Sequence, residues 1–269
     1  MNQIKTFFLM LILTVILMYV GYSIYDMNGM LIGLGVSFLM NFVSYYFSDK
    51  IVLAQYGAQD VPEDSRLYRI VAHLAQKDGL PVPRVCIVED PSPNAFATGR
   101  DPNHAAVCAT TGIMNILTDD ELEGVIAHEL SHVKHRDILV STIAAGLCGA
   151  ITLVFRFGLI FAGGDRRGNG GCGTVIALLI GSLAATIIQL WISRTREYMA
   201  DKSGAELCGK PWALADALEK LARGISEQPM QNTTPETRNM FILNPVSIAA
   251  NLFSTHPPIE DRIKKLRSM

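Results

Sequence analysis

The chain divides into long apolar stretches without charge and segments with the mixed pattern of a soluble protein. Asp, Glu, Lys and Arg are absent from residues 6–25, 27–48, 138–155 and 168–193. A helix needs about 20 apolar residues to cross about 30 Å of hydrocarbon. The first two stretches meet this length on either side of a short polar turn at 26–29. We therefore expect residues 1–48 to form a transmembrane hairpin.

Two of the apolar stretches, the first and the third, have an alternative interpretation. A cleavable signal peptide is the alternative for the first stretch, but the apolar run exceeds the core of about 7–15 residues that such a peptide has, and a second span follows at once. The third stretch spans only about 27 Å as a helix and ends at Arg156. It either continues past this arginine to residue 162 or lies as a hairpin arm at the membrane surface. We expect residues 138–193 to form a second membrane hairpin.

The two remaining segments, 49–137 and 194–269, have the patterns of two parts of one folded domain. Apolar residues at helical spacing predict helices, which lie at 62–77, 194–207 and 212–223. Three short β-rich runs predict a small antiparallel sheet, and they lie at 84–88, 95–98 and 105–110. A polar stretch without periodicity, 224–240, predicts a loop.

Composition supports the same division. Only 18% of the residues are charged, against about 25% in a typical soluble domain. Because the deficit lies in the apolar stretches, it excludes a purely cytosolic globule and a disordered chain. The net charge of −2 leaves no basic field for nucleic acid. The five cysteines have no CxxC spacing, which predicts reduced, mostly buried thiols rather than a disulfide scaffold.

Basic residues near the spans predict the orientation in the membrane. One side would hold only Arg166 and Arg167. The other side would hold Lys5, Lys50, Lys134, Arg136, Arg194, Arg196 and Lys202. The side with the positive majority is predicted to be cytoplasmic, so the two soluble segments meet in the cytoplasm.

Residues 128–132 read HELSH, which is an HExxH motif. Thr118 and Glu121 have the spacing of a capping box, so we expect the motif on a helix. One helical turn then brings His132 onto the face of His128, where two imidazoles can bind one metal ion. Glu129 is placed to take a proton from a water acidified by zinc. A chance match is the alternative, and it is rare for a chain with six histidines.

A catalytic zinc needs a third protein ligand and an open position. His135 lies about 10 Å along the helix axis from His128, which is too far, and Ile138 stands where the metzincin pattern has a histidine. Glu197 and Asp201 lie one turn apart on a later predicted helix. Such an acid pair is also typical of a solvated helix face. Beside an HExxH motif that lacks a ligand, it favours Glu197 as the ligand and Asp201 as the group that orients a ligand histidine.

Further motifs surround these residues. They are KxRD at 134–137, SRTREYMAD at 193–201, NAFATG at 94–99 and STHPP at 254–258, with Arg262 after it. In this order, and with two N-terminal spans, they resemble the HtpX family of membrane zinc metalloproteases, which is related to the CAAX prenyl proteases. The resemblance covers essentially the whole chain. It implies a gluzincin architecture with a Glu as third ligand, and proteolysis of membrane proteins in quality control and the stress response.

The resemblance also implies roles outside the ligand set. An extended substrate can add to a sheet edge through backbone hydrogen bonds, and the implied edge is Asn94, Ala95, Phe96, Ala97 and Thr98. A core strand with Phe96 packed inside is the alternative, and the two are compatible. His256 and Arg262 are implied donors to the oxyanion of the tetrahedral intermediate. A helix cap and an ion pair with a surface acid are the alternatives for them.

The expected fold is therefore a membrane α-helical part joined to a cytoplasmic α+β gluzincin domain, with a small antiparallel sheet and an HExxH helix. The expected function is a zinc endopeptidase that cleaves misfolded membrane proteins or unfolded polypeptides. One Zn²⁺ per chain would be held by His128, His132 and Glu197. We expect a multi-pass protein of a bacterial or archaeal inner membrane, in contact with the lipid bilayer, and self-cleavage within the 224–240 loop.

Three other classes fit part of the pattern. An intramembrane protease has its HExxH motif inside a span, but the charges at 119–123 and 134–137 keep this helix out of hydrocarbon. An adaptor with a structural zinc would have four protein ligands and no need of Glu129. A transporter is disfavoured because Arg156 is the only ionisable residue expected within a span.

Overall fold

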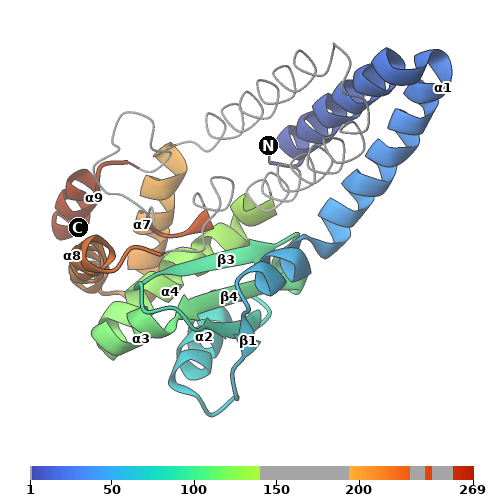
Figure 1. The fold of residues 1–269 in the computed structure, drawn as a ribbon. Helices are drawn as coiled ribbons and strands as arrows, with labels where there is room; N and C mark the ends of the chain where they lie inside the picture. The colour runs from blue at the N-terminus through green and yellow to red at the C-terminus, as the bar shows by residue number, and fades with distance from the viewer. Residues whose placement is uncertain (1, 140–193, 231–239, 244–256) are drawn as a thin grey trace.

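An apolar helical hairpin projects from an α/β body in the computed structural model (Figure 1). The structure describes residues 2–139, 194–230, 240–243 and 257–269. Helix α1 (Asn2–Gln55) is broken at Tyr25 and Asp26, where non-helical backbone angles reverse the chain. Its arms, Thr6–Ser23 and Tyr25–Phe47, are long and apolar enough to cross a membrane, and less than a fifth of each is buried. In length and composition they agree with the hairpin predicted for residues 1–48.

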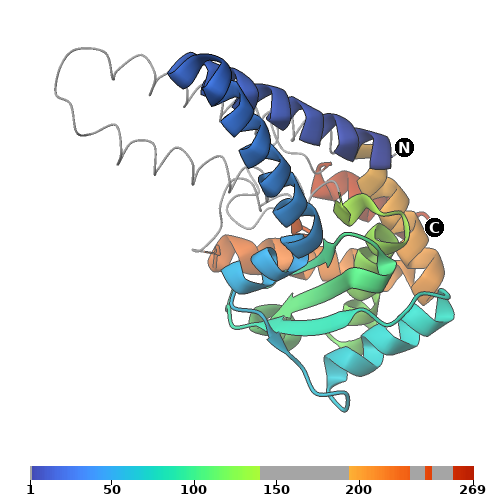
Figure 2. The same cartoon turned by 90° about the vertical axis from the view of Figure 1, so that its right-hand side faces the viewer.

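The two arms of α1 lie side by side because glycines let their backbones approach closely (Figure 2). A Cβ atom on Gly21 would lie 2.1 Å from the carbonyl oxygen of Gly29. Asn41 Nδ2 also donates to Thr14 Oγ1 across the arms at 3.1 Å. Small residues and buried polar pairs are the usual means by which helices associate in lipid, so this packing suits a membrane hairpin.

The second arm of α1 continues without interruption into the body. The hairpin is predicted to end at residue 48 and the apolar part of this arm ends at Phe47, while the helix itself runs on to Gln55. Val52 and Leu53 are buried in an apolar cluster with Cys86, Phe96 and Cys108 of the sheet. The base of the hairpin is therefore packed against the sheet.

Four short strands form a mixed sheet in the order β1-β2-β4-β3. They are β1 (Gln59–Asp60), β2 (Arg84–Val88), β3 (Ala95–Gly99) and β4 (Ala105–Thr110). The predicted strands are confirmed, and β3 pairs antiparallel with β4. The prediction of a wholly antiparallel sheet is wrong, because β2 and β4 run parallel. After β2 the chain crosses to the far edge of the sheet and forms β3. It then returns through a short connection to form β4 between β2 and β3, so β3 is the edge strand.

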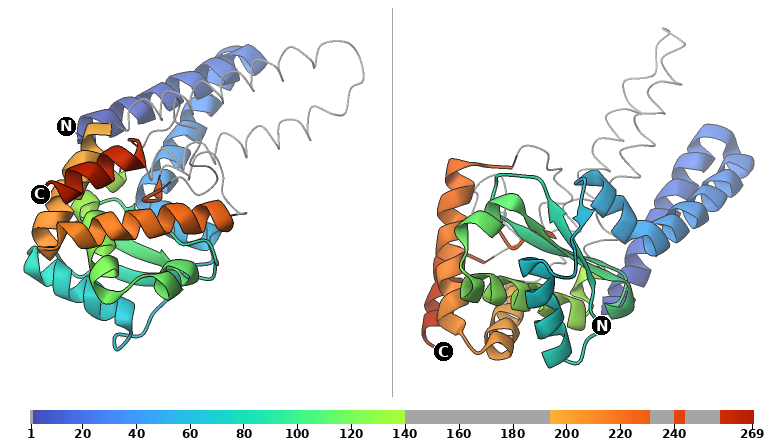
Figure 3. Two further views of the ribbon diagram at one scale, coloured as in Figure 1. Left: turned by 90° about the vertical axis from the view of Figure 1, so that its left-hand side faces the viewer. Right: turned by 90° about the horizontal axis from the view of Figure 1, so that it is seen from below.

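Helices from both halves of the sequence surround α4 (Figure 3). The helices are α2 (Arg66–Lys77), α3 (Thr111–Ile116), α4 (Asp119–Lys134), α7 (Arg194–Cys208), α8 (Pro211–Glu227) and α9 (Ile259–Arg267), and a short 3₁₀ turn, η1, spans Pro102–His104. Helix α4 packs against β3 and β4 and against α2, α7 and α8. The main apolar core lies between these elements, and it holds α4 and α7 together although about 60 residues separate them in sequence.

The helices confirm the periodicity of the sequence, with one correction. Helix α8 extends to Glu227, so the loop predicted to begin at residue 224 begins later. A helix continues there because Ile225 is buried against the core. Residues 231–239 of the predicted self-cleavage loop lie outside the described residues. The second predicted membrane hairpin does too, apart from its first two residues, which are buried.

The cysteines agree with the expected reduced state where the structure describes them. Cys86, Cys108 and Cys208 are free and buried. Cys148 and Cys172 lie outside the described residues.

Candidate active site

The helix that carries the HExxH motif begins at a complete capping box. The Thr118 hydroxyl accepts from the Glu121 N–H, and Glu121 Oε2 accepts from the Thr118 N–H at 2.8 Å. Lys220 of α8 donates to the same carboxylate oxygen at 2.8 Å. These bonds confirm the predicted cap. They fix the residue at which α4 begins, and therefore the direction in which the HExxH side chains point two turns later.

Three side chains converge where the middle of α4 meets the start of α7. His128 Nε2 lies 3.2 Å from His132 Nε2 and 3.8 Å from Glu197 Oε2. His132 Nε2 lies 3.7 Å from Glu197 Oε1. Two ligands bound to a tetrahedral zinc at about 2.0–2.1 Å stand about 3.3 Å apart. The structure therefore brings the three predicted ligands together with separations that suit one shared metal ion.

Asp201 lies against His128 on the side away from this cluster. His128 Nδ1 lies 2.9 Å from Asp201 Oδ1, and Arg262 Nε and Nη2 donate to the two oxygens of Asp201 at 2.8 and 2.7 Å. Burial raises the pKa of Asp201, but Arg262 and His128 more than offset this and bring it to about 2. The carboxylate is thus charged and lies within ion-pair distance of Nδ1, while Nε2 of His128 faces His132.

Asp137 stands in the corresponding position behind His132, and it was not among the predicted site residues. His132 Nδ1 lies 3.4 Å from Asp137 Oδ2, and Arg196 Nη1 lies 3.4 Å from the other oxygen. Arg136 has a φ of 57°, which ends α4 and turns Asp137 back toward the motif. A residue five positions after a ligand lies on a different helical face, so periodicity gave no sign of it. The only signal was its place in the KxRD motif.

Glu129 lies between the cluster and the sheet edge. Its side chain is buried, and its carboxylate lies near the backbone of Ala97 in β3, which favours the charged form. Burial raises the pKa of Glu129 to about 8; Glu197 adds to the rise, and His132 and Arg262 oppose it. A carboxyl group with a pKa near neutrality suits a role in accepting and returning a proton.

The electrostatics of the cluster favour a bound cation. Burial lowers the pKa of His132, but Asp137, Glu197 and Glu129 overcome this and raise it to about 9. Four carboxylates surround the two imidazoles and Arg262 supplies positive charge; they are Glu129, Asp137, Glu197 and Asp201. Imidazole and carboxylate donors in this number are those of a catalytic zinc site with an open position. The residues present therefore fit a divalent metal ion.

The remaining predicted site residues occupy different environments. Asn94, Ala95, Phe96, Ala97 and Thr98 are buried, with the last four in the edge strand β3. The Phe96 ring packs on Tyr56 and Phe241, so this strand is a core strand as well as an edge. Arg262 is fully buried, so an ion pair with a surface acid is wrong for it. His135 is exposed at the end of α4 and is not part of the cluster, and His256 lies outside the described residues.

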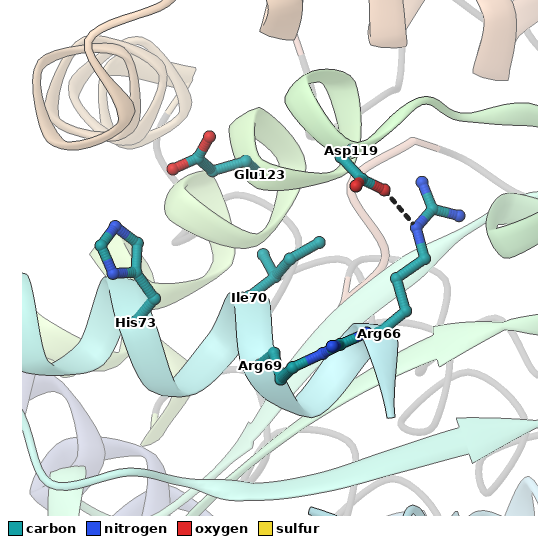
Figure 4. Close-up of a pocket in the computed structure, with 6 residues that line it drawn as sticks. All are labelled: Arg66, Arg69, Ile70, His73, Asp119 and Glu123. Carbon is teal, nitrogen blue, oxygen red and sulfur yellow. Dashed lines mark hydrogen bonds and ion pairs between the residues drawn. The ribbon is translucent and has the colours of Figure 1, made fainter. Parts of the chain in front are cut away.

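A separate pocket of about 370 Å³ lies between α2 and the first turns of α4 (Figure 4). It is lined by Arg66, Arg69, Ile70, His73, Asp119 and Glu123. Arg66 pairs with Asp119 and donates to the carbonyls of Met114 and Leu117 at 3.0 and 2.7 Å. Its guanidinium therefore fastens α2 to the corner between α3 and α4. None of the lining residues is a predicted site residue, and we assign this pocket a structural role.

Comparisons with known proteins agree with this geometry. Residues 62–269 match the model of peptidase family M48. The chain is 48% identical to a protease HtpX homolog of Thermococcus sibiricus, over 99% of this chain and 95% of that protein. It is 49% identical to one of Ralstonia pickettii, over 100% and 96%. The crystal structure of Ste24p from S. mikatae shares the fold, with a TM-score of 0.54, 16% identity and coverage of 94% of this chain and 62% of that one. The chain therefore belongs to peptidase family M48 and is a membrane-bound metalloprotease.

Proposed function

We propose that the protein is a zinc endopeptidase whose metal is held by His128, His132 and Glu197. The observation that supports this is the convergence of three ligand atoms, one from each residue, within 4.8 Å of one another. When bound, zinc would polarise the peptide carbonyl and acidify a water molecule. Asp201 and Asp137 orient the two imidazoles so that both Nε2 atoms point inward.

In this proposal Glu129 moves the proton. It takes a proton from the attacking water and returns it to the nitrogen of the departing amine. Its burial beside the Ala97 backbone holds the carboxylate between the sheet edge and the ligands. The buried Arg262 guanidinium, with Nη1 3.7 Å from Glu197 Oε2, supplies positive charge where the oxyanion would form. His256 remains a proposed second donor by resemblance alone.

The substrate is proposed to be a polypeptide strand that adds to the outer edge of β3. Ala95 and Ala97 present their backbone groups to that edge, because Asn94 and Phe96 pair with β4. Such pairing draws its affinity from main-chain hydrogen bonds, which any extended polypeptide offers, and this suits an enzyme that cleaves misfolded membrane proteins. Fragments of membrane proteins should therefore disappear in cells in which Glu129→Gln replaces the wild type, and unchanged fragments would contradict this substrate class.

The active site is proposed to face the cytoplasm, at the base of the α1 hairpin. The distribution of Lys and Arg supports this orientation. Glu63 is exposed in the body, so a cysteine at this position should react with a membrane-impermeant maleimide only after cells are permeabilised. Labelling in intact cells would contradict the orientation.

Metal analysis tests the ligand set. The purified full chain should cleave casein, lose activity in a chelator and regain it with Zn²⁺. The Glu197→Ala variant should lose bound zinc, because it leaves only two protein ligands. A matched control is Glu219→Ala, since Glu219 forms an exposed ion pair with Arg267. Zinc content equal to that of the wild type in Glu197→Ala would refute the assignment.

A further inference from the structure

A segment of the chain itself, Met240–Leu243, lies along the outer edge of β3; we call it the 240–243 segment. Phe241 forms an antiparallel bridge with Phe96, and the Ile242 N–H donates to the Ala95 carbonyl at 3.1 Å. The segment therefore extends the sheet beyond β3, in the place and manner proposed above for a substrate strand.

The backbone carbonyls of this segment also accept hydrogen bonds from polar side chains of the site. Arg262 Nη1 donates to the Ile242 carbonyl at 3.0 Å, and the same nitrogen lies 3.7 Å from Glu197 Oε2. Asn94 Nδ2 donates to the Leu243 carbonyl at 3.1 Å. Two groups proposed for substrate, the Ala95 carbonyl and the Arg262 guanidinium, are thus bonded to the chain itself, and so is the neighbouring Asn94 amide. A peptide strand cannot pair with this part of β3 while the segment lies there.

The side chains of the segment fill apolar positions. The Phe241 ring packs edge-on against Phe96 and Tyr56, with centroids 5.2 and 5.3 Å apart. Ile242 and Leu243 are buried in the main core. An occupant of this edge therefore places an aromatic side chain beside Phe96 and aliphatic side chains at the next two positions.

We propose that the 240–243 segment occupies the substrate site as a substrate mimic, so that a polypeptide must displace it to be cleaved. The displacing strand then carries an aromatic residue followed by two aliphatic residues. Apolar segments of membrane proteins have this composition. The inference rests on the proposed peptidase function and specifies how that site selects its substrate.

Backbone hydrogen bonds make such an exchange feasible. The bonds to Ala95, Asn94 and Arg262 all involve main-chain atoms of the segment, and any peptide offers the same atoms. Among the described residues, Phe241 and Phe96 form the bridge between the segment and β3. The alternative is that the segment is a permanent wall of the site, in which case its removal would impair catalysis.

The Phe241→Ala variant distinguishes these two possibilities. It removes the ring that packs against Phe96 and weakens the segment without changing a proposed catalytic group. We expect KM for a quenched fluorescent peptide with Phe-Ile-Leu at its centre to fall about tenfold, with kcat similar to that of the wild type. The matched control is Met230→Ala, because Met230 is buried in the same apolar cluster but lies outside the segment; its KM should not fall.

A second measurement uses the unaltered full chain, in case the variant does not fold. An unlabelled peptide with the sequence Met-Phe-Ile-Leu should compete with the fluorescent substrate, and a Met-Ser-Asn-Ser peptide should not. A lower kcat/KM in Phe241→Ala with normal zinc content, or equal competition by the two peptides, would overturn the inference. If the wild type shows no zinc-dependent cleavage of casein or peptide, the proposed function fails instead, so the two failures are distinguishable.

Discussion

Replacement of Asp201 by Asn should weaken both the metal site and the fold. Asp201 accepts two hydrogen bonds from Arg262 and lies against His128 Nδ1, and all three side chains are buried. Asparagine keeps the volume but removes the negative charge. It leaves the buried Arg262 without its main counter-charge, and it no longer holds the Nδ1 proton of His128 as firmly.

The structure supports an estimate of each effect. Arg262 and His128 lower the pKa of Asp201 from 3.8 to about 2, which corresponds to roughly 2 kcal/mol of folding free energy. Removing one partner of a buried ion pair costs about 3–5 kcal/mol. We therefore expect the free energy of unfolding to fall by about 3 kcal/mol. Loss of a group that orients a metal-bound histidine should weaken zinc binding about 10–100-fold.

The pH dependence has a defined sign. Because the folded-state pKa of Asp201 is below its ordinary value of 3.8, its contribution is fully present above that value. The contribution is lost as the pH falls toward about 2. The wild type and Asp201→Asn should therefore differ most near neutral pH and approach each other in strong acid.

Denaturant unfolding of the zinc-free protein in detergent measures the stability, and competition with a chelating dye measures zinc affinity. Asp216→Asn is the matched control, because Asp216 pairs with Arg267 at the surface and should change stability by less than about 1 kcal/mol. Zinc affinity within twofold of the wild type in Asp201→Asn would refute the orienting role. Unchanged stability would refute the importance of the buried pair.

Two further predictions concern neighbouring groups. Asp137→Asn should weaken zinc binding about tenfold, measured with the same dye, because Asp137 lies against His132 Nδ1; unchanged affinity would remove it from the site. Glu121→Gln should lower the free energy of unfolding by about 1 kcal/mol at pH 7. Burial raises the pKa of Glu121, but Lys220 and Thr118 lower it by more, so the net shift is downward. The difference in unfolding free energy between variant and wild type should therefore vanish at a pH below that lowered pKa. A difference in stability that persisted there would contradict the charge-based explanation.

Local patterns predicted the parts of the site that depend on neighbours along one helix. Helical periodicity places His128 and His132 on one face, and the capping box of Thr118 and Glu121 is formed within a single turn. Both features depend on contacts three or four residues apart, so they can be read from the sequence. The charge-free stretches predicted the α1 hairpin for a similar reason, because the length and polarity of one segment decide whether it can span a membrane.

Contacts between distant segments were not predicted. The parallel pairing of β2 with β4 depends on where β3 is inserted, and the short β-rich runs do not encode strand order. The 240–243 segment has an ordinary apolar sequence, and only the fold places it against β3, about 145 residues earlier in the chain. Arg262 was expected to donate to an oxyanion, with an ion pair at the surface as the alternative. The fold excludes the surface pair, because the packing of α7 and α9 buries Arg262 beside Asp201.

The Glu129→Gln variant tests the central claim most directly. Purified variant and wild type are compared for bound zinc and for hydrolysis of casein. Glutamine keeps the shape of the side chain and leaves the three ligands intact, but it cannot accept the proton of the water. The account predicts about one zinc per chain in both proteins and a kcat at least about 100-fold lower in the variant. Hydrolysis by the zinc-loaded variant at the rate of the wild type would contradict the account.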